Sequence, residues 1–164
     1  MPANALTITK FYTAFAQLDG DGMEACYAEG AAFEDEVFTL RGKAQTMGMW
    51  RMLIDATRAK STDDWLLEFN AVVADATTGQ AHWDAHYRFS ATARMVINRI
   101  NAQFTFDNEG LIITHRDRFN FWSWSSQALS AVGLLLGWSP FLRSKVRQQA
   151  AGNLQNFMAK RKPS

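Results

Sequence analysis

The sequence has 164 residues, of which 48% are hydrophobic and 20% charged, values typical of one soluble globular domain that exclude a disordered chain. The formal net charge of +1 gives no reason to expect nucleic acid or another polyanion as a partner. The longest apolar run, residues 128–142, contains Gly, Ser and Pro, and no stretch approaches the roughly 20 apolar residues of a membrane-spanning helix.

A single cysteine, Cys26, excludes an intrachain disulfide and fits a reducing compartment. Residues 1–11 lack the basic start and the long apolar run of a signal peptide. We therefore expect a cytoplasmic protein.

The first third of the chain has the pattern of three helices with two short strands before the last of them. Apolar residues at helical spacing predict a helix over 4–18, which the sequence DGDG at 19–22 ends. A second, short helix is predicted to run to Tyr27. Residues 31–42 predict two short strands joined by an acidic turn, and residues 43–58 predict a helix that presents Trp50 on its apolar face.

Four long strand-like runs follow, at 64–74, 81–90, 95–106 and 111–122, joined by turn sequences. Adjacent strands with short links form an antiparallel sheet, so this order predicts an α+β domain with the helices packed on one side of the sheet. The chain changes character after Trp122, and we divide it into a domain over 1–124 and a C-terminal helical extension over 125–164, whose last helix begins near Pro140.

Polar and aromatic residues alternate in the second of these strands, AHWDAHYRF, residues 81–89. His82, Asp84, His86 and Arg88 fall on one face of a strand, and the aromatic residues fall on the other. The polar face is either solvated, as on any half-buried strand, or it lines a pocket in which titratable groups do chemistry.

Three stretches carry a resemblance to a known family: FYTAF…DGDGMEACYAEGAAFED (11–35), FDNEGLI (106–112) and HRDRFNFW (115–122). Their order and spacing resemble the nuclear-transport-factor-2-like superfamily, which includes ketosteroid isomerases, SnoaL-type polyketide cyclases and limonene epoxide hydrolases. The resemblance covers about residues 5–122. It implies a cone-shaped roll, in which a curved antiparallel sheet wraps the N-terminal helices and leaves a deep pocket at its open end.

The resemblance implies catalytic roles for Asp35 and Tyr12. Asp35 occupies the place of the general base of the ketosteroid isomerases, and an apolar pocket would raise the basicity of such a carboxylate. Tyr12 lies near the place of their oxyanion-stabilising tyrosine. The alternatives are that Asp35 belongs to a solvated acidic turn and that Tyr12 is a core residue with its hydroxyl at the edge.

Asp117 matches the aspartate that activates water in the limonene epoxide hydrolases and the acid–base aspartate of the SnoaL-type cyclases. Its strand face also carries His115 and Phe119, and the alternative role for Asp117 is a buried ion pair with Arg99.

An ungapped count back from Asp117 places Asp84 and His86 where the epoxide hydrolases have an arginine and a second aspartate. Phe33 stands in place of the tyrosine that holds the water. These differences argue against epoxide hydrolysis, but His86 remains a candidate acid or base. In this scheme Trp83, Tyr87 and Phe89 face away from the pocket, where we expect them to support a homodimer.

Histidine and aspartate are also metal ligands, but the span of about 13 Å from His82 to His86, at about 3.3 Å per residue, directs the two imidazoles apart. We therefore expect neither a metal nor another cofactor.

Together these residues predict a site for a small, largely apolar molecule of polyketide, steroid-like or terpenoid type. We expect cofactor-independent acid–base catalysis of isomerase, cyclase or hydrolase type, which requires Asp35, His86 and Asp117 to converge. The alternative is a non-catalytic ligand-binding or dimerisation module. The extension is expected to pack on its own domain, and contact with a membrane surface is its alternative. The predicted catalytic residues are Asp35, Asp117, His86 and Tyr12, and the predicted substrate-binding residues are Asp84, Phe33, Trp50, Arg99, His115 and Phe119.

Overall fold

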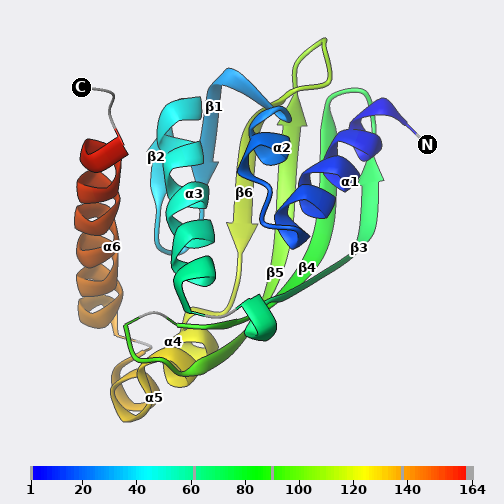
Figure 1. Cartoon of the computed structure of the whole chain (residues 1–164). Helices are drawn as coiled ribbons and strands as arrows, with labels where there is room; N and C mark the ends of the chain where they lie inside the picture. Colours follow the sequence, from blue (N-terminus) through cyan, green and yellow to red (C-terminus); the bar gives the residue numbers. More distant parts are fainter. Residues whose placement is uncertain (1, 61, 90, 138, 162–164) are drawn as a thin grey trace.

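The structure, a computed structural model, describes residues 2–60, 62–89, 91–137 and 139–161. A curved six-stranded sheet forms one layer (Figure 1), and helices α1 (Ala3–Ala16), α2 (Gly20–Glu24) and α3 (Lys43–Lys60) pack on its inner face. The predicted α+β class, with the N-terminal helices held in a curved sheet, is confirmed.

The sheet has the strand order β2-β1-β6-β5-β4-β3. Strands β3 to β6 form the predicted antiparallel meander, whereas β1 lies parallel to β6, so the sheet is not antiparallel throughout. The parallel pair brings the carboxyl ends of β1 and β6 to the same end of the sheet. The strands are β1 (Tyr27–Glu34), β2 (Thr39–Arg41), β3 (Leu66–Ala74), β4 (Thr78–Arg88), β5 (Met95–Phe106) and β6 (Ile112–Arg118), and the short 3-10 helix η1 (Thr62–Asp64) precedes β3.

Several predicted boundaries are wrong. Tyr27 begins β1 instead of ending the short helix. The last strand ends at Arg118 and not at residue 122, because Asn120 caps helix α4 (Phe121–Leu129): its side chain accepts a hydrogen bond from the Ser123 N–H at 3.0 Å. The run predicted over 81–90 ends as a strand at Arg88, and residue 90 lies outside the described residues.

Burial alternates along the two central strands. Ala81, Trp83 and Ala85 of β4 are buried, and so are Ile100 and Phe104 of β5, while the residues between them are mostly more exposed. This inner face packs against α1 and α3, and burial of its apolar surface is the main favourable term that holds the two layers together.

The predicted boundary at residue 124 falls inside helix α4, and α4 and the rest of the extension pack on the domain, as expected. Helix α4 lies across the end of the sheet where β1, β4 and β6 end and β5 begins, which we call the mouth (Figure 1). There Trp124 Nε1 donates to the Tyr87 hydroxyl at 2.8 Å, and Phe121 and Val96 are buried together. Helices α5 (Ala131–Leu136) and α6 (Pro140–Arg161) follow, and α6 runs beside α3 with Leu154 buried.

Residues 138 and 162–164 of the predicted extension lie outside the described residues. None of the described helices is both long and apolar enough to cross a membrane.

Candidate functional site

Two polar side chains lie on the inner face of β6, among apolar neighbours. His115 and Asp117 are 1% and 2% exposed, and they alternate with the exposed Arg116 and Arg118. His115 Nε2 lies 2.9 Å from Asp117 Oδ1. The two residues share a face, as strand alternation predicts. A buried carboxylate is costly unless hydrogen bonds compensate for its lost hydration, so its partners decide what it can do.

The hydrogen bonds around His115 have a consistent direction. The Trp50 indole N–H can only donate, and it donates to the Tyr27 hydroxyl at 3.0 Å. With Asp117 ionised, His115 Nε2–H donates to the carboxylate, and Nδ1 accepts from the Tyr27 hydroxyl at 2.7 Å. The chain of donors therefore favours the tautomer of His115 that carries its proton on Nε2. Trp83 Nε1 also lies 3.5 Å from Asp117 Oδ1, at the long limit of a hydrogen bond.

Aromatic rings enclose this polar pair. The Phe104 ring lies 4.4 Å from the imidazole of His115, centroid to centroid, and the rings of Phe11, Phe33 and Trp50 lie at 5.0 to 5.9 Å. The rings exclude water, and electrostatic interactions between the enclosed groups are stronger for that reason.

Tyr12 of α1 brings to the same region a hydroxyl that has no partner in the described part of the chain. Its ring contacts those of Trp83 and Phe104, at centroid distances of 5.7 and 6.2 Å. Its hydroxyl oxygen is buried and has no hydrogen-bond partner among the described residues. Burial raises the pKa of Tyr12 well above its usual value, and the charge of Asp117 raises it further, so the phenol stays protonated. A buried hydroxyl of this kind is a donor that lacks an acceptor.

Asp35 follows β1 directly and lies at the mouth. In the parallel β1–β6 register Phe33 is opposite His115 and Glu34 is opposite Arg116, which brings Asp35 level with Asp117. Asp35 Oδ1 accepts from the backbone N–H groups of Val37 at 2.7 Å and Phe38 at 2.6 Å, so this carboxyl also shapes the turn into β2.

Burial raises the pKa of Asp35 to about 7; its two backbone donors oppose the shift, and the charges of Asp117 and Glu36 add to it. Asp35 and Asp117 are therefore close enough to interact, and Asp35 holds its proton through the acid range. A carboxyl whose pKa is raised close to a second carboxyl is a frequent arrangement in acid–base catalysis.

The predicted orientation of β4 is wrong. Asp117 is opposite Ala102, and Ala102 is opposite Ala81, so these three share the inner face. Trp83 points inward with them and is 5% exposed, whereas His86 is on the outer face and does not converge with Asp35 and Asp117. The ungapped count from Asp117 fails because an error of one residue moves every side chain of a strand to the opposite face.

Asp84 and Arg99 are also on the outer face. Asp84 Oδ1 lies 2.9 Å from His82 Nε2, and His82 Nδ1 lies 2.8 Å from Asn101 Oδ1. Arg99 is exposed and opposite Asp84, and in the described part of the chain no ion pair joins it to Asp84 or Asp117. The proposed buried pair between Asp117 and Arg99 is therefore wrong.

The remaining predicted binding residues lie inside the fold. His115 forms the polar centre with Asp117, and the rings of Phe33 and Trp50 lie against it. Phe119 is partly buried between this centre and α4. Sequence reasoning missed Tyr27, because no pattern in its neighbourhood indicates a hydrogen bond to a residue on β6. It also placed Trp83, Tyr87 and Phe89 outward, although alternation on a half-buried strand favours an inward aromatic face. Tyr87 and Phe89 pack against α4 instead.

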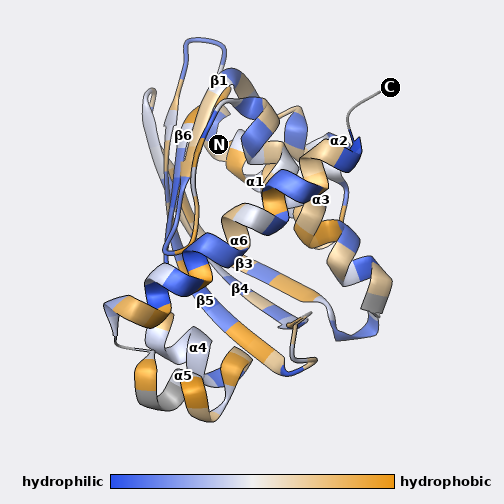
Figure 2. Ribbon diagram, turned by 90° about the vertical axis from the view of Figure 1, so that its left-hand side faces the viewer, coloured by the Kyte–Doolittle hydropathy of each residue, from blue (hydrophilic) through white to orange (hydrophobic). Residues whose placement is uncertain are grey.

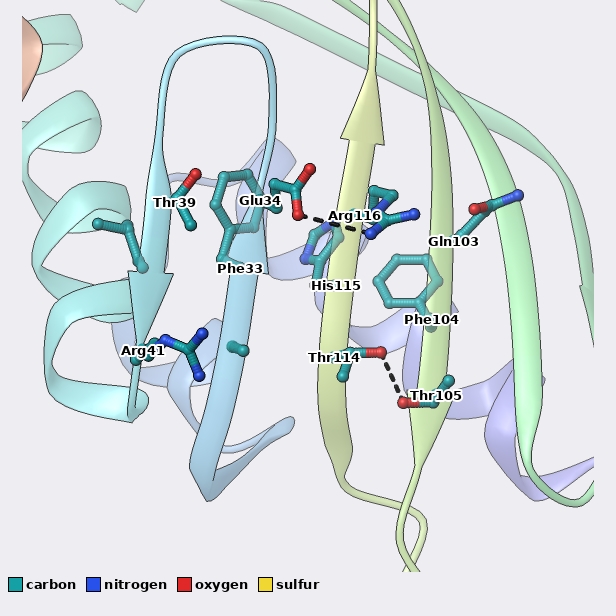
Figure 3. Close-up of a pocket in the computed structure, with 12 residues that line it drawn as sticks. Phe33, Glu34, Thr39, Arg41, Gln103, Phe104, Thr105, Thr114, His115 and Arg116 are labelled. Carbon is teal, nitrogen blue, oxygen red and sulfur yellow. Dashed lines mark hydrogen bonds and ion pairs between the residues drawn. The ribbon is translucent and has the colours of Figure 1, made fainter. Parts of the chain in front are cut away.

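The two hollows described are both on the outside of the molecule. Figure 3 shows the first, a groove of about 410 Å³ between β1, β2, β5 and β6. Its lining includes the polar residues Glu34, Arg41 and Arg116 and also Phe33, Phe104 and His115. The second, of about 420 Å³, lies between the α1–α2 turn, α3 and Arg161. Aromatic rings and α4 fill the mouth, where the pocket was expected. Among the described residues no three His, Cys, Asp or Glu side chains are grouped to hold a metal ion.

Sequence comparison places this arrangement in a family. The sequence profile described as "SnoaL-like domain" matches residues 8–115, well over half of the chain. The chain belongs to the SnoaL-like domain family. The match to the SnoaL-like domain ends before Asp117 and before the extension. A search of curated proteins found no match.

Solved structures share the fold of this SnoaL-like chain at low identity. A proposed polyketide cyclase from Xanthomonas campestris is 19% identical with a TM-score of 0.61, over 77% of this chain and 96% of its own. An epoxide hydrolase of limonene-epoxide-hydrolase-like type from M. tuberculosis is 18% identical with a TM-score of 0.59, over 84% of this chain and 97% of its own. A protein with a ketosteroid isomerase-like fold from Catenulispora acidiphila, in complex with trimethylamine, is 11% identical with a TM-score of 0.58, over 74% of this chain and 91% of its own.

Proposed function

We propose that the protein binds a small, largely apolar molecule with a carbonyl or hydroxyl group between α1 and the mouth, and transfers a proton on it without a cofactor. The observation that carries this proposal is the buried carboxyl of Asp117, whose charge acts on the Tyr12 phenol, together with a Tyr12 hydroxyl that has no partner among the described residues. A carbonyl oxygen would supply the acceptor that this phenol lacks.

In the proposed reaction Asp117 removes a proton from the carbon beside the carbonyl. His115 is fully enclosed and acts through Asp117, which it orients by the Nε2–H bond, so it is a positioning residue. Tyr12 donates to the oxygen on which negative charge develops, and Asp35 is the acid that returns a proton. Access lies at the mouth, so α4 must move before a ligand enters.

The related proteins named as polyketide cyclase and epoxide hydrolase support a small organic substrate of this kind. We infer that the aromatic lining selects a polyketide, steroid-like or terpenoid skeleton, since such rings offer apolar contact and few polar groups.

The second candidate function is ligand binding without chemistry. The observation that favours it is that one oxygen of Asp35 is held by two backbone donors and both nitrogens of His115 are bonded, which suits a structural cluster.

A simple ketone separates the two candidates. With 2-tetralone in heavy water, proton NMR measures the exchange of the protons beside the carbonyl, and tryptophan fluorescence measures binding. We expect the protein to accelerate exchange, and Asp117→Asn, which keeps the acceptor for His115, to lower the rate by about 10²- to 10⁴-fold. His86→Asn, on the outer face, is the matched control and should keep the wild-type rate. Binding without exchange would support the second candidate. The absence of both binding and exchange would contradict the proposal.

A further inference from the structure

Charge is divided unevenly along the chain. All 16 acidic residues lie at or before Asp117, whereas the segment after Arg118 contains six lysines and arginines and no acidic residue. The overall net charge of +1 does not reveal this division. The cations of the extension lie in its last part, at residues 143–147 and 160–162, and residues 125–142 are uncharged.

Helix α4 and the extension that follows it also expose large apolar side chains at one end of the molecule. Trp122, Val132, Leu136 and Phe141 are 43%, 52%, 43% and 68% exposed, and we call these four the apolar tip. Figure 2 shows α4 and α5 beyond the end of the sheet, with hydrophobic residues on α5.

Close helix packing brings Trp122 of α4 beside α5, which carries two members of the tip. The backbone of α5 at Gly133 lies directly against the Ser125 carbonyl of α4, and Gly137 lies beside the Trp122 side chain. Val132 and Leu136 are one turn apart on α5, and Phe141 lies in the first turn of α6.

Cationic side chains border the tip. Lys145 Nζ lies 5.6 Å from the centroid of the Phe141 ring, and Arg147 donates to the Thr39 hydroxyl at 3.1 Å. Arg143 pairs with Glu36 at 3.0 Å, but in the described part of the chain no carboxylate pairs with Lys145 or Arg147. The tip therefore combines exposed apolar area with positive charge that its own domain does not neutralise.

We propose that the apolar tip binds the surface of an anionic lipid bilayer. Apolar side chains insert among the acyl chains while nearby lysine and arginine side chains meet the lipid phosphates, and this combination is typical of segments that lie in the membrane interface. A second copy of the chain would bring cation against cation at the same tip. The inference does not depend on any chemistry at Asp117.

Co-sedimentation of the full chain with lipid vesicles tests the proposal. We expect binding to phosphatidylcholine vesicles that contain a quarter of phosphatidylglycerol, weaker binding in high salt, and little binding to phosphatidylcholine alone. Phe141→Ser should weaken binding at least about tenfold, and Lys145→Gln about fivefold.

Val73→Ser and Lys10→Gln are the matched controls, because both residues are exposed on other elements. Neither should change binding, and circular dichroism should show all four variants folded. The proposal is overturned if the wild type does not bind the anionic vesicles, or if the control variants weaken binding as much as the tip variants do. It is also overturned if light scattering shows a dimer that Phe141→Ser abolishes while vesicles are not bound.

Discussion

Tyr12 and Tyr27 carry the same phenol in the same core, with opposite hydrogen bonding. The Tyr27 hydroxyl forms hydrogen bonds with both Trp50 and His115, whereas the Tyr12 hydroxyl forms none with any described residue. We expect Tyr12→Phe to raise the free energy of unfolding by about 1 kcal/mol, because it removes an unsatisfied buried group. Tyr27→Phe should lower it by about 1–3 kcal/mol, because it leaves two partners unpaired. Denaturant unfolding measures both, and destabilisation by Tyr12→Phe would mean that its hydroxyl is satisfied.

Asp35 predicts a dependence of stability on pH. Its pKa is raised to about 7 in the fold, from 3.8, so the folded state holds this proton more tightly than the unfolded chain. The contribution of Asp35 to the free energy of unfolding is fully present below about pH 4 and is lost as the pH rises towards 7. The free energy of unfolding falls over this range by at most about 1.4 kcal/mol per pH unit. Asp35→Asn keeps the acceptor for Val37 and Phe38 and should remove this slope from denaturant unfolding between pH 4 and 7. An unchanged slope in the variant would show that Asp35 is ionised throughout.

Among the individual residues, the sequence indicates some of the candidate site and not others. Asp117 and His115 stand out because two polar residues share the parity of apolar ones on a strand. Tyr27 cannot be found this way, because its role comes from the pairing of β1 with β6, far apart in the chain.

Among the elements, α5 depends on a glycine for its contact with α4. A methyl group at Gly133 would meet the Ser125 carbonyl, which is backbone and cannot turn aside. We expect Gly133→Ala to lower the free energy of unfolding by about 1–3 kcal/mol through overpacking. Gly152→Ala, in α6 with open space around it, is the control and should raise it by about 0.5–1 kcal/mol. Thermal unfolding compares them, and equal effects would contradict the close packing of α4 and α5.

Periodicity predicts most elements correctly, because each long helix and strand has one apolar face that the core requires. It fails where a capping interaction decides, as at Asn120, and where contacts distant in sequence decide, as in the parallel pairing of β1 with β6. The orientation of β4 could be predicted from its aromatic face alone, and the family count overrode that simpler signal.

For the whole molecule, order of elements and composition predict the α+β class but not the place of the extension. An apolar, cationic segment has several surfaces on which to pack, and the structure shows that it covers the mouth and α3. The homodimer stays a prediction. The aromatic residues assigned to its interface are inside or under α4, so any dimer would have to use other outer-face residues such as Ile97 and Ile113.

The central claim is that the functional site lies inside the sheet, at His115 and Asp117, and not on its polar outer face. The chain has three histidines, and nitrogen-15 NMR of their rings reports on both faces at once. We predict that His115 carries its proton on Nε2 and that 2-tetralone shifts its ring signals while those of His82 and His86 stay unchanged. A shift at His86 with His115 unmoved would contradict the account.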